Sequence, residues 1–252
     1  DVPSGQTSEN VAYVAAQLRA LRGFLEQTTG HQIDEGRLVQ RVKRGYKTLQ
    51  QFDAFQSARA DRFIPSDLVS PLYSGMTNNI LLGTEEEALY TEKLLQDVKK
   101  APPKKGKHIY WMHTLPFWSD AVKDALLLND DAQIVGCELS QATDISRYSE
   151  DPYEEMAMRL IYHALNGPIS RRINAGIRHA KQAGADGVVW FNHWGCKHTL
   201  GGSRIAKKCF EEAGLPTLIL DGDGCDRSHG GEGQTSTRLG AFLEMLGDFA
   251  HE

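Results

Sequence analysis

The sequence predicts an α/β protein in which a four-stranded parallel sheet follows an N-terminal helical layer. The first hundred residues carry apolar residues at three-four spacing and no strand pattern. A Pro- and Lys-rich linker over 101–106 then separates them from the remainder. Beyond the linker, short apolar runs alternate with helical patterns, as a parallel sheet with right-handed crossovers requires. We therefore expect a helical accessory region over 1–100 and an α/β domain over 107–252.

Four helices are expected in the first region. The first ends at Gly30 and turns one apolar face inward, formed by Val11, Val14, Leu18, Leu21 and Leu25. The second is capped by Asp34 and buries a stripe formed by Leu38, Val42, Leu49 and Phe52. A looser third helix is expected to start at 65–67. The fourth spans 85–99, with acidic residues early and lysines late, as the helix dipole favours.

Four strands and five helices are expected after the linker. The strands fall at 108–112, 133–137, 187–191 and 217–220, and the helices at 118–128, 153–165, 169–182, 203–213 and 234–249. The closing helix directs its apolar residues inward, namely Leu239, Phe242, Leu243, Leu246 and Phe249. Arg171 and Arg172 are expected to cover an exposed helix face.

Composition excludes several classes of protein. A net charge of -5 and the lack of a dominant Lys/Arg cluster disfavour a nucleic-acid partner. No apolar run approaches the roughly 20 residues that span a bilayer, and no signal-peptide pattern is present, so we expect no membrane partner. Four cysteines are too few for a disulfide scaffold and fit a reducing cytoplasm. Because the chain opens without Met, we expect a fragment or a processed chain.

Polar or reactive side chains follow each predicted strand. His113 follows the first strand, Cys137 ends the second, His193 and Cys196 follow the third, and Cys225 follows the fourth. The carboxyl ends of parallel strands meet at one edge, where open α/β sheets bind ligands. Two thiols on neighbouring strands at that edge predict a metal site, and most plausibly an iron–sulfur cluster.

The thiols differ in their local sequence. Cys196 directly precedes a helix, a position that lowers the pKa of a thiol and suits a metal-bound thiolate. Cys225 lies in a Gly-rich turn, where packing gives little reason for a thiol. Cys137 follows an apolar run, which favours a core thiol, and Cys209 falls at a core position within a helix. His113 could be a ligand, a proton donor or a simple polar residue at a strand end, and the same alternatives hold for His193.

Three stretches resemble the C-terminal region of 2-hydroxyacyl-CoA dehydratase subunits. They are His193-Trp-Gly-Cys-Lys197, Leu220-Asp-Gly-Asp-Gly-Cys-Asp226 and the segment 233–246. Benzoyl-CoA reductase subunits and double-cubane cluster proteins belong to the same superfamily. The segment 111–118 and the opening helix are similar too, so the resemblance covers essentially the whole chain.

The resemblance implies a subunit with flavodoxin-like α/β domains that holds a [4Fe-4S] cluster through three cysteines. It also implies a second homologous subunit and an ATP-hydrolysing activator that delivers one electron. The acyl-CoA substrate would become a ketyl radical, expel its 2-hydroxyl group and leave as an enoyl-CoA. In the family an upstream α/β domain supplies cluster cysteines, and it is missing from this chain. We therefore expect that domain elsewhere in the parent protein, with Cys196 as the first and Cys225 as the second ligand candidate here.

Two other functions remain open from sequence. The first is a double-cubane reductase of small molecules that uses no coenzyme A. The second is a cluster-free scaffold subunit that completes a dimer. A plain nucleotide-binding module is disfavoured, because no G-x-G-x-x-G motif follows the first strand.

Overall fold

A four-stranded, all-parallel sheet forms the centre of the C-terminal half and confirms the predicted α/β fold. The computed structural model describes residues 1–141, 143–229 and 231–248. The strands are β1 (Lys107–Met112), β2 (Ala132–Cys137), β3 (Gly187–His193) and β4 (Thr217–Gly222). Their order in the sheet is β2-β1-β3-β4, and all three pairings are parallel. The chain therefore reverses its direction of winding at β1.

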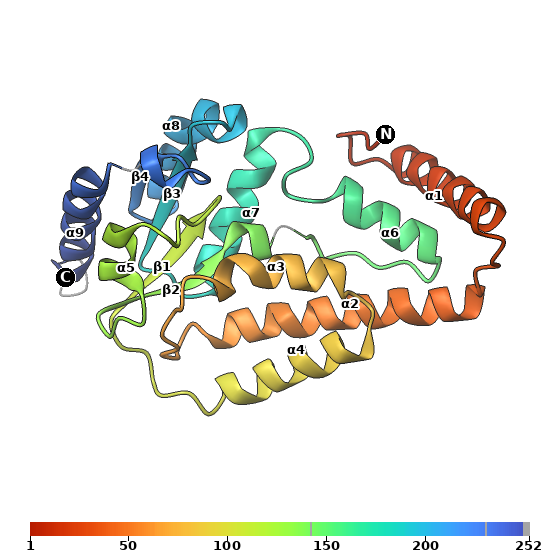
Figure 1. Cartoon of the computed structure of the whole chain (residues 1–252), viewed down its shortest axis with the longest axis horizontal. Helices are drawn as coiled ribbons and strands as arrows, with labels where there is room; N and C mark the ends of the chain where they lie inside the picture. The colour runs from red at the N-terminus through yellow and green to blue at the C-terminus, as the bar shows by residue number, and fades with distance from the viewer. Residues whose placement is uncertain (142, 230, 249–252) are drawn as a thin grey trace.

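Nine α-helices accompany the sheet in the described part of the chain. They are α1 (Ser8–Thr29), α2 (Glu35–Ala58), α3 (Ser70–Ile80), α4 (Glu85–Val98), α5 (Asp120–Leu126), α6 (Pro152–Ile161), α7 (Ile169–Gln182), α8 (Lys197–Glu212) and α9 (Glu232–Asp248). Two short 3-10 turns, η1 (Glu138–Ser140) and η2 (Arg227–His229), follow β2 and β4. Helices α1 and α9 lie at opposite ends of the molecule (Figure 1).

Helices cover both faces of the sheet because side chains alternate along each strand. Trp111 and Val189 join the core that the sheet shares with α5 and α9. Tyr110 and Trp190, their neighbours in the chain, join the opposite core with α7 and α8. At Gly187 a Cβ atom would lie 2.8 Å from side-chain carbons of α9, so a glycine allows this helix to approach β3. The two cores hold the sheet rigidly beneath its carboxyl edge.

The helical layer beside the sheet draws on both halves of the chain. Helix α2 packs against α4 and α6, and α1 packs against α6. Val14 and Ala15 of α1 are buried with Tyr153, Ala157 and Ile161 of α6. Helix α3 contacts β2 and η1, which joins the layer to the edge of the sheet. In Figure 1, α6 lies between α1 and the other helices of this layer.

The inward face predicted for the first helix is wrong in its second half. Leu21 and Leu25 are 49% and 42% exposed. Helix α1 has 22 residues but α6, which covers it, has only 10. The hydrophobic period indicates a buried face, but it does not indicate how far the covering helix extends.

Several predicted helix limits also differ. Helix α3 starts at Ser70 instead of 65–67, because Leu68 has a left-handed φ of 64°. Helix α6 ends at Ile161, four residues before the predicted limit. Helix α8 starts at Lys197, ahead of the predicted 203, and contains Gly202, which packs against Ile169. Of the apolar residues predicted for α9, three are buried and Leu243 is partly buried, whereas Phe249 lies outside the described residues.

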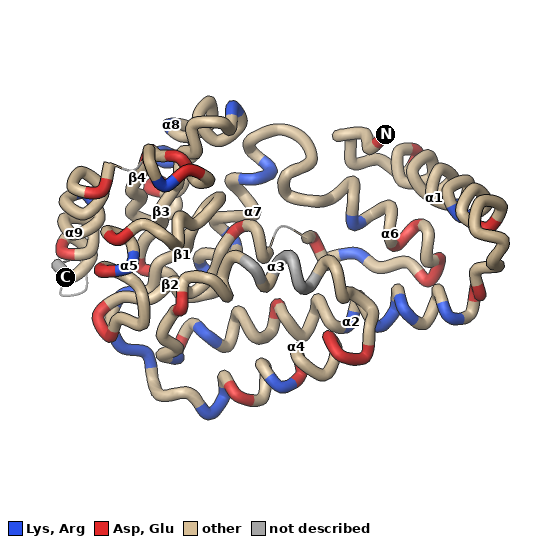
Figure 2. The backbone as a smooth tube through the Cα atoms, in the orientation of Figure 1, with Lys and Arg blue, Asp and Glu red and all other residues tan. Residues whose placement is uncertain are grey.

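Charged residues of both signs are interspersed along the backbone, as Figure 2 shows for Lys and Arg among Asp and Glu. None of the described helices is both long and apolar enough to cross a membrane.

Candidate functional site

The third and fourth strands carry their polar ends side by side, as the sequence predicted. Asn192 pairs with Asp221 and His193 with Gly222 in the parallel register of β3 and β4. The Asn192 side chain donates a 2.8 Å hydrogen bond to an oxygen of Asp221. The backbone N–H of Trp194 donates to the Gly222 carbonyl at 3.0 Å. The loops that follow the two strands therefore start from adjacent, tied positions.

His193, Asp223 and Cys225 form a compact group of donors at this edge, each offering one atom within 4.8 Å of the others. The N–H of Gly224 donates to His193 Nδ1 at 2.9 Å. Nδ1 must therefore carry a lone pair, and in the neutral ring the proton lies on Nε2. The Nε2 atom lies close to Gly195, where a Cβ atom would be only 3.0 Å away from it.

Asp223 organises the loop after β4. Its Oδ1 accepts hydrogen bonds from the N–H groups of Cys225 and Asp226 at 2.9 and 3.1 Å. Its Oδ2 lies 3.1 Å from Nδ1 of His229. The N–H of Cys225, the His229 ring and the N–H of Asp226 together lower the pKa of Asp223 to about 2. The hydrogen bond between Asp223 and His229 in turn raises the pKa of His229. Asp223 is therefore an anion at neutral pH and fixes the backbone of Cys225, whose side chain is exposed.

Cys196 lies at the N-cap of α8 and is partly buried. The hydroxyl of Thr199 donates a hydrogen bond to its sulfur at 2.9 Å. Burial by itself raises the pKa of this thiol. That effect is outweighed by the Thr199 hydroxyl, by the N–H groups of Thr199 and His198, and by the positive charge of Arg172, so the net pKa is lowered. The environment of Cys196 favours a thiolate, the form that binds metals. Its sulfur is not part of the group formed by His193, Asp223 and Cys225.

His113 lies beside His193 because β1 and β3 are neighbours in the sheet. Their rings stack with centroids 6.1 Å apart and an interplanar angle of 19°. His113 has a left-handed φ of 76°, which turns its side chain at the end of β1. Burial, followed by the nearby charge of Arg172, lowers the pKa of His113 to about 4. His113 is therefore neutral at pH 7, and it is a weaker base than a free imidazole.

The other two cysteines lack the features of a ligand. Cys137 is fully buried and its sulfur lies 3.5 Å from the His113 carbonyl. Burial raises the pKa of this thiol to about 12, so it is neutral at pH 7. Cys209 lies within α8 and packs against the core between the sheet, α7 and α8.

A buried ion pair that the sequence analysis missed supports this edge. Arg172 and Glu138 have side chains only 1% and 4% exposed, and they form a two-point contact with Nη2 and Oε2 2.6 Å apart. Glu138 Oε2 also accepts the backbone N–H of His113 at 3.0 Å. Arg172 Nη1 lies 3.1 Å from Nδ1 of His198. The pair therefore connects η1 and α7 to the backbone of His113.

The prediction that Arg172 covers an exposed face is wrong. The residue is 2% exposed and its guanidinium lies 4.8 Å from the centre of the Trp190 ring. One signal was available in the sequence, since Arg172 shares a helical face with Ile169, Ile173 and Gly176. An arginine within an apolar face is therefore a signal to look for a buried partner such as an acid.

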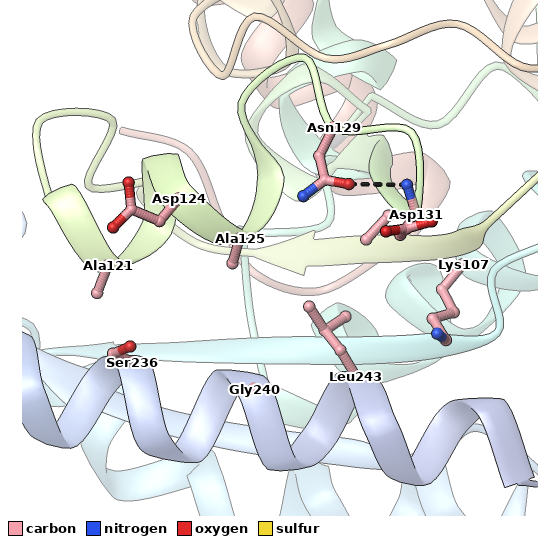
Figure 3. Close-up of a pocket in the computed structure, with 10 residues that line it drawn as sticks. Lys107, Ala121, Asp124, Ala125, Asn129, Asp131, Ser236, Gly240 and Leu243 are labelled. Carbon is pink, nitrogen blue, oxygen red and sulfur yellow. Dashed lines mark hydrogen bonds between the residues drawn. The ribbon is translucent and has the colours of Figure 1, made fainter.

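A cavity of about 310 Å³ lies beside the sheet and reaches Lys107 and Ala132, which begin β1 and β2, away from the carboxyl edge. It opens between α5 and α9, close to Lys107 at the start of β1 (Figure 3). There the Asn129 side chain accepts a 2.7 Å hydrogen bond from the N–H of Asp131, as the dashed line shows. The cavity shares no residue with the cysteine and histidine site, so it is not part of the candidate site.

The fold and this edge define an α/β protein with a thiolate-favouring cysteine and paired histidines at the carboxyl ends of parallel strands. The family model described as "2-hydroxyglutaryl-CoA dehydratase, D-component" matches residues 1–246. The chain belongs to this family, which confirms the resemblance noted in the sequence and makes it a component of a 2-hydroxyacyl-CoA dehydratase. No curated protein matches the chain.

Proposed function

We propose that this chain is an iron–sulfur component of an enzyme that converts a 2-hydroxyacyl-CoA to an enoyl-CoA. The observation that carries the proposal is the environment of Cys196 in a member of this family. Its sulfur lies at a helix N-terminus, accepts a hydrogen bond from Thr199 and has a lowered pKa. A thiolate in such a position is a suitable ligand for iron. Cys225, exposed in the neighbouring loop, is the second ligand candidate.

The donor set fits part of the coordination of a [4Fe-4S] cluster. Such a cluster is held mainly by cysteine thiolates. Cys196 and Cys225 are accessible and follow adjacent strands, whereas Cys137 is buried and stays protonated. Two thiolates do not complete a cluster, so the remaining ligands would come from outside the described residues. An upstream domain of the parent protein would supply them, and a second homologous subunit would close the site.

The difficult step in this dehydration is loss of a β-proton that is not acidic. When bound and reduced by an ATP-hydrolysing activator, a [4Fe-4S] cluster would lend one electron to the substrate and take it back after water has left. With that electron the thioester carbonyl would be a ketyl radical, which can expel the 2-hydroxyl group. The chain itself must then protonate the leaving 2-hydroxyl group and accept the β-proton. His193 and His113, whose rings stack at the carboxyl edge of the sheet, are the side chains that we assign to these two proton transfers. His113 would take part as the neutral imidazole, a weaker base than a free histidine because burial lowers its pKa to about 4.

The ion pair between Glu138 and Arg172 would serve as a positioning device in this scheme. Glu138 holds the N–H of His113 at 3.0 Å, and Arg172 contacts His198 at 3.1 Å. Both contacts come from side chains that are almost fully buried. The ion pair would therefore hold the backbone of His113 in place while substrate and product exchange, which is a requirement for efficient proton transfer. Such chemistry belongs in a reducing, oxygen-poor cytoplasm.

The test is iron and acid-labile sulfide analysis with EPR on anaerobically purified protein. Cys196→Ala should lower the bound iron, whereas Cys209→Ala should not, since Cys209 packs in a core. Equal iron in the two variants would refute the ligand assignment. A colourless wild-type protein would instead support the scaffold subunit. Iron without turnover of any 2-hydroxyacyl-CoA would support the small-molecule reductase.

A further inference from the structure

A second cavity, of about 230 Å³, lies between α2, α3 and α4 and reaches Gly136 of β2. It shares no residue with the cysteine and histidine site. Its apolar wall is formed by Phe52, Phe55, Tyr90 and Leu94. Its polar lining includes Gln56, Arg59, Ser66 and Ser70. A mostly apolar cavity with a few polar groups is the usual form of a small-molecule site.

Arg59 is the unusual member of this lining. It is 7% exposed, and its Nη2 atom donates a 2.9 Å hydrogen bond to the Ile134 carbonyl. Within the described residues, Nε of Arg59 is buried without a hydrogen-bond acceptor, no ion pair with a carboxylate is formed, and the guanidinium lies 5.7 Å from the centre of the Phe55 ring. Burial lowers the pKa of Arg59 to about 10, with no acidic group acting to raise it. The guanidinium is thus a buried cation at neutral pH with its Nε donor unused.

The nearest polar groups of the lining do not neutralise this charge. Asp67 lies at the exposed rim, where Oδ1 accepts the N–H groups of Val69 and Ser70 and Oδ2 accepts the Ser70 hydroxyl. Its carboxylate is therefore committed to the start of α3. Gln56 is 3% exposed and its side-chain oxygen has no partner among the described residues. Buried charges and amides are normally paired, because leaving them unpaired is costly.

We propose that this cavity binds a small carboxylic acid with an apolar body, independently of the dehydratase site. The carboxylate would accept hydrogen bonds from the Arg59 guanidinium, the cation of the lining. The body would pack against Phe52, Phe55 and Tyr90. The volume of about 230 Å³ equals roughly eight waters at about 30 Å³ each, so the cavity suits an acid of about eight to ten non-hydrogen atoms. A phosphate ester is less suitable, since one guanidinium and an apolar wall do not match a dianion.

The charge of Arg59 can be tested by isothermal titration calorimetry with hexanoate and phenylacetate. Hexanamide and phenylacetamide serve as neutral controls of nearly the same shape. The acids should bind at least about tenfold more tightly than the amides, because hydrogen bonds to charged groups are the stronger kind. Equal affinity of acids and amides, or no binding of either acid at millimolar concentration, would overturn the proposal. This comparison uses the wild-type chain and needs no variant.

A pair of variants assigns the binding to this cavity. Arg59→Met removes the buried charge at the C-cap of α2, and Arg37→Met removes an exposed arginine from the first turn of α2. The preference for acids should disappear in Arg59→Met and persist in Arg37→Met. A preference that survives in a folded Arg59→Met protein, or an equal loss in both variants, would place the binding elsewhere and refute the inference.

Discussion

Removal of the buried ion pair at the sheet edge should destabilise the protein strongly. In Arg172→Met the Glu138 carboxylate stays buried. Of its present hydrogen-bond donors it keeps only the backbone N–H of His113. Glu138→Gln leaves the Arg172 guanidinium without its anion. Loss of one partner from a buried pair typically costs about 3–5 kcal/mol, because the remaining charge stays desolvated. For a chain of this size that corresponds to a fall in Tm of roughly 6–20 °C.

Urea denaturation followed by circular dichroism under anaerobic conditions measures this effect. Lys208→Met is the matched control, since Lys208 and Glu212 form an exposed pair with side chains 76% and 65% accessible. Such a pair contributes at most about 1 kcal/mol. The double variant Arg172→Met/Glu138→Gln should lose less free energy of unfolding than the sum of the single losses. Strict additivity, or a loss in Arg172→Met no larger than in Lys208→Met, would refute the coupling.

Two further predictions concern titration and thiol reactivity. Burial, with the nearby Arg178 charge, lowers the pKa of His179 from 6.5 to about 4. Between these values the unfolded chain binds more protons, so the free energy of unfolding should decrease as pH falls from about 6.5 to 4, by at most about 3 kcal/mol from this residue. A His179→Asn variant should show a weaker pH dependence in urea titrations, and an unchanged one would contradict the prediction. Separately, iodoacetamide at pH 8 should alkylate exposed Cys225 quickly and Cys137 only after unfolding, because the pKa of Cys137 is about 12. Mass spectrometry of the peptides decides this, and rapid native labelling of Cys137 would be the contrary result.

The order of elements and the location of the reactive residues could be predicted from the sequence. Strands and helices follow from the periods of the apolar residues, which are local properties of the chain. Parallel strands share a carboxyl edge, so the polar residues after β3 and β4 had to lie on that edge. The Gly-rich turn and the helix start single out Cys225 and Cys196 as ligand candidates, and their role as ligands stays a prediction.

The tertiary structure alone decided which of these residues meet. His113 stacks on His193 because β1 adjoins β3, and a strand order with this crossover is not encoded in any local period. Arg172 finds Glu138 across 34 positions of sequence, so its burial depends on a partner that the helix pattern does not identify. The pKa values of Cys137 and Cys196 differ for the same reason. Burial under other elements raises the pKa of the Cys137 thiol, whereas hydrogen bonds and a nearby positive charge lower the pKa of the Cys196 thiol. Local periodicity thus indicates which faces can turn inward, whereas the extent to which they are covered and the pairing of charged and reactive groups require contacts between distant segments.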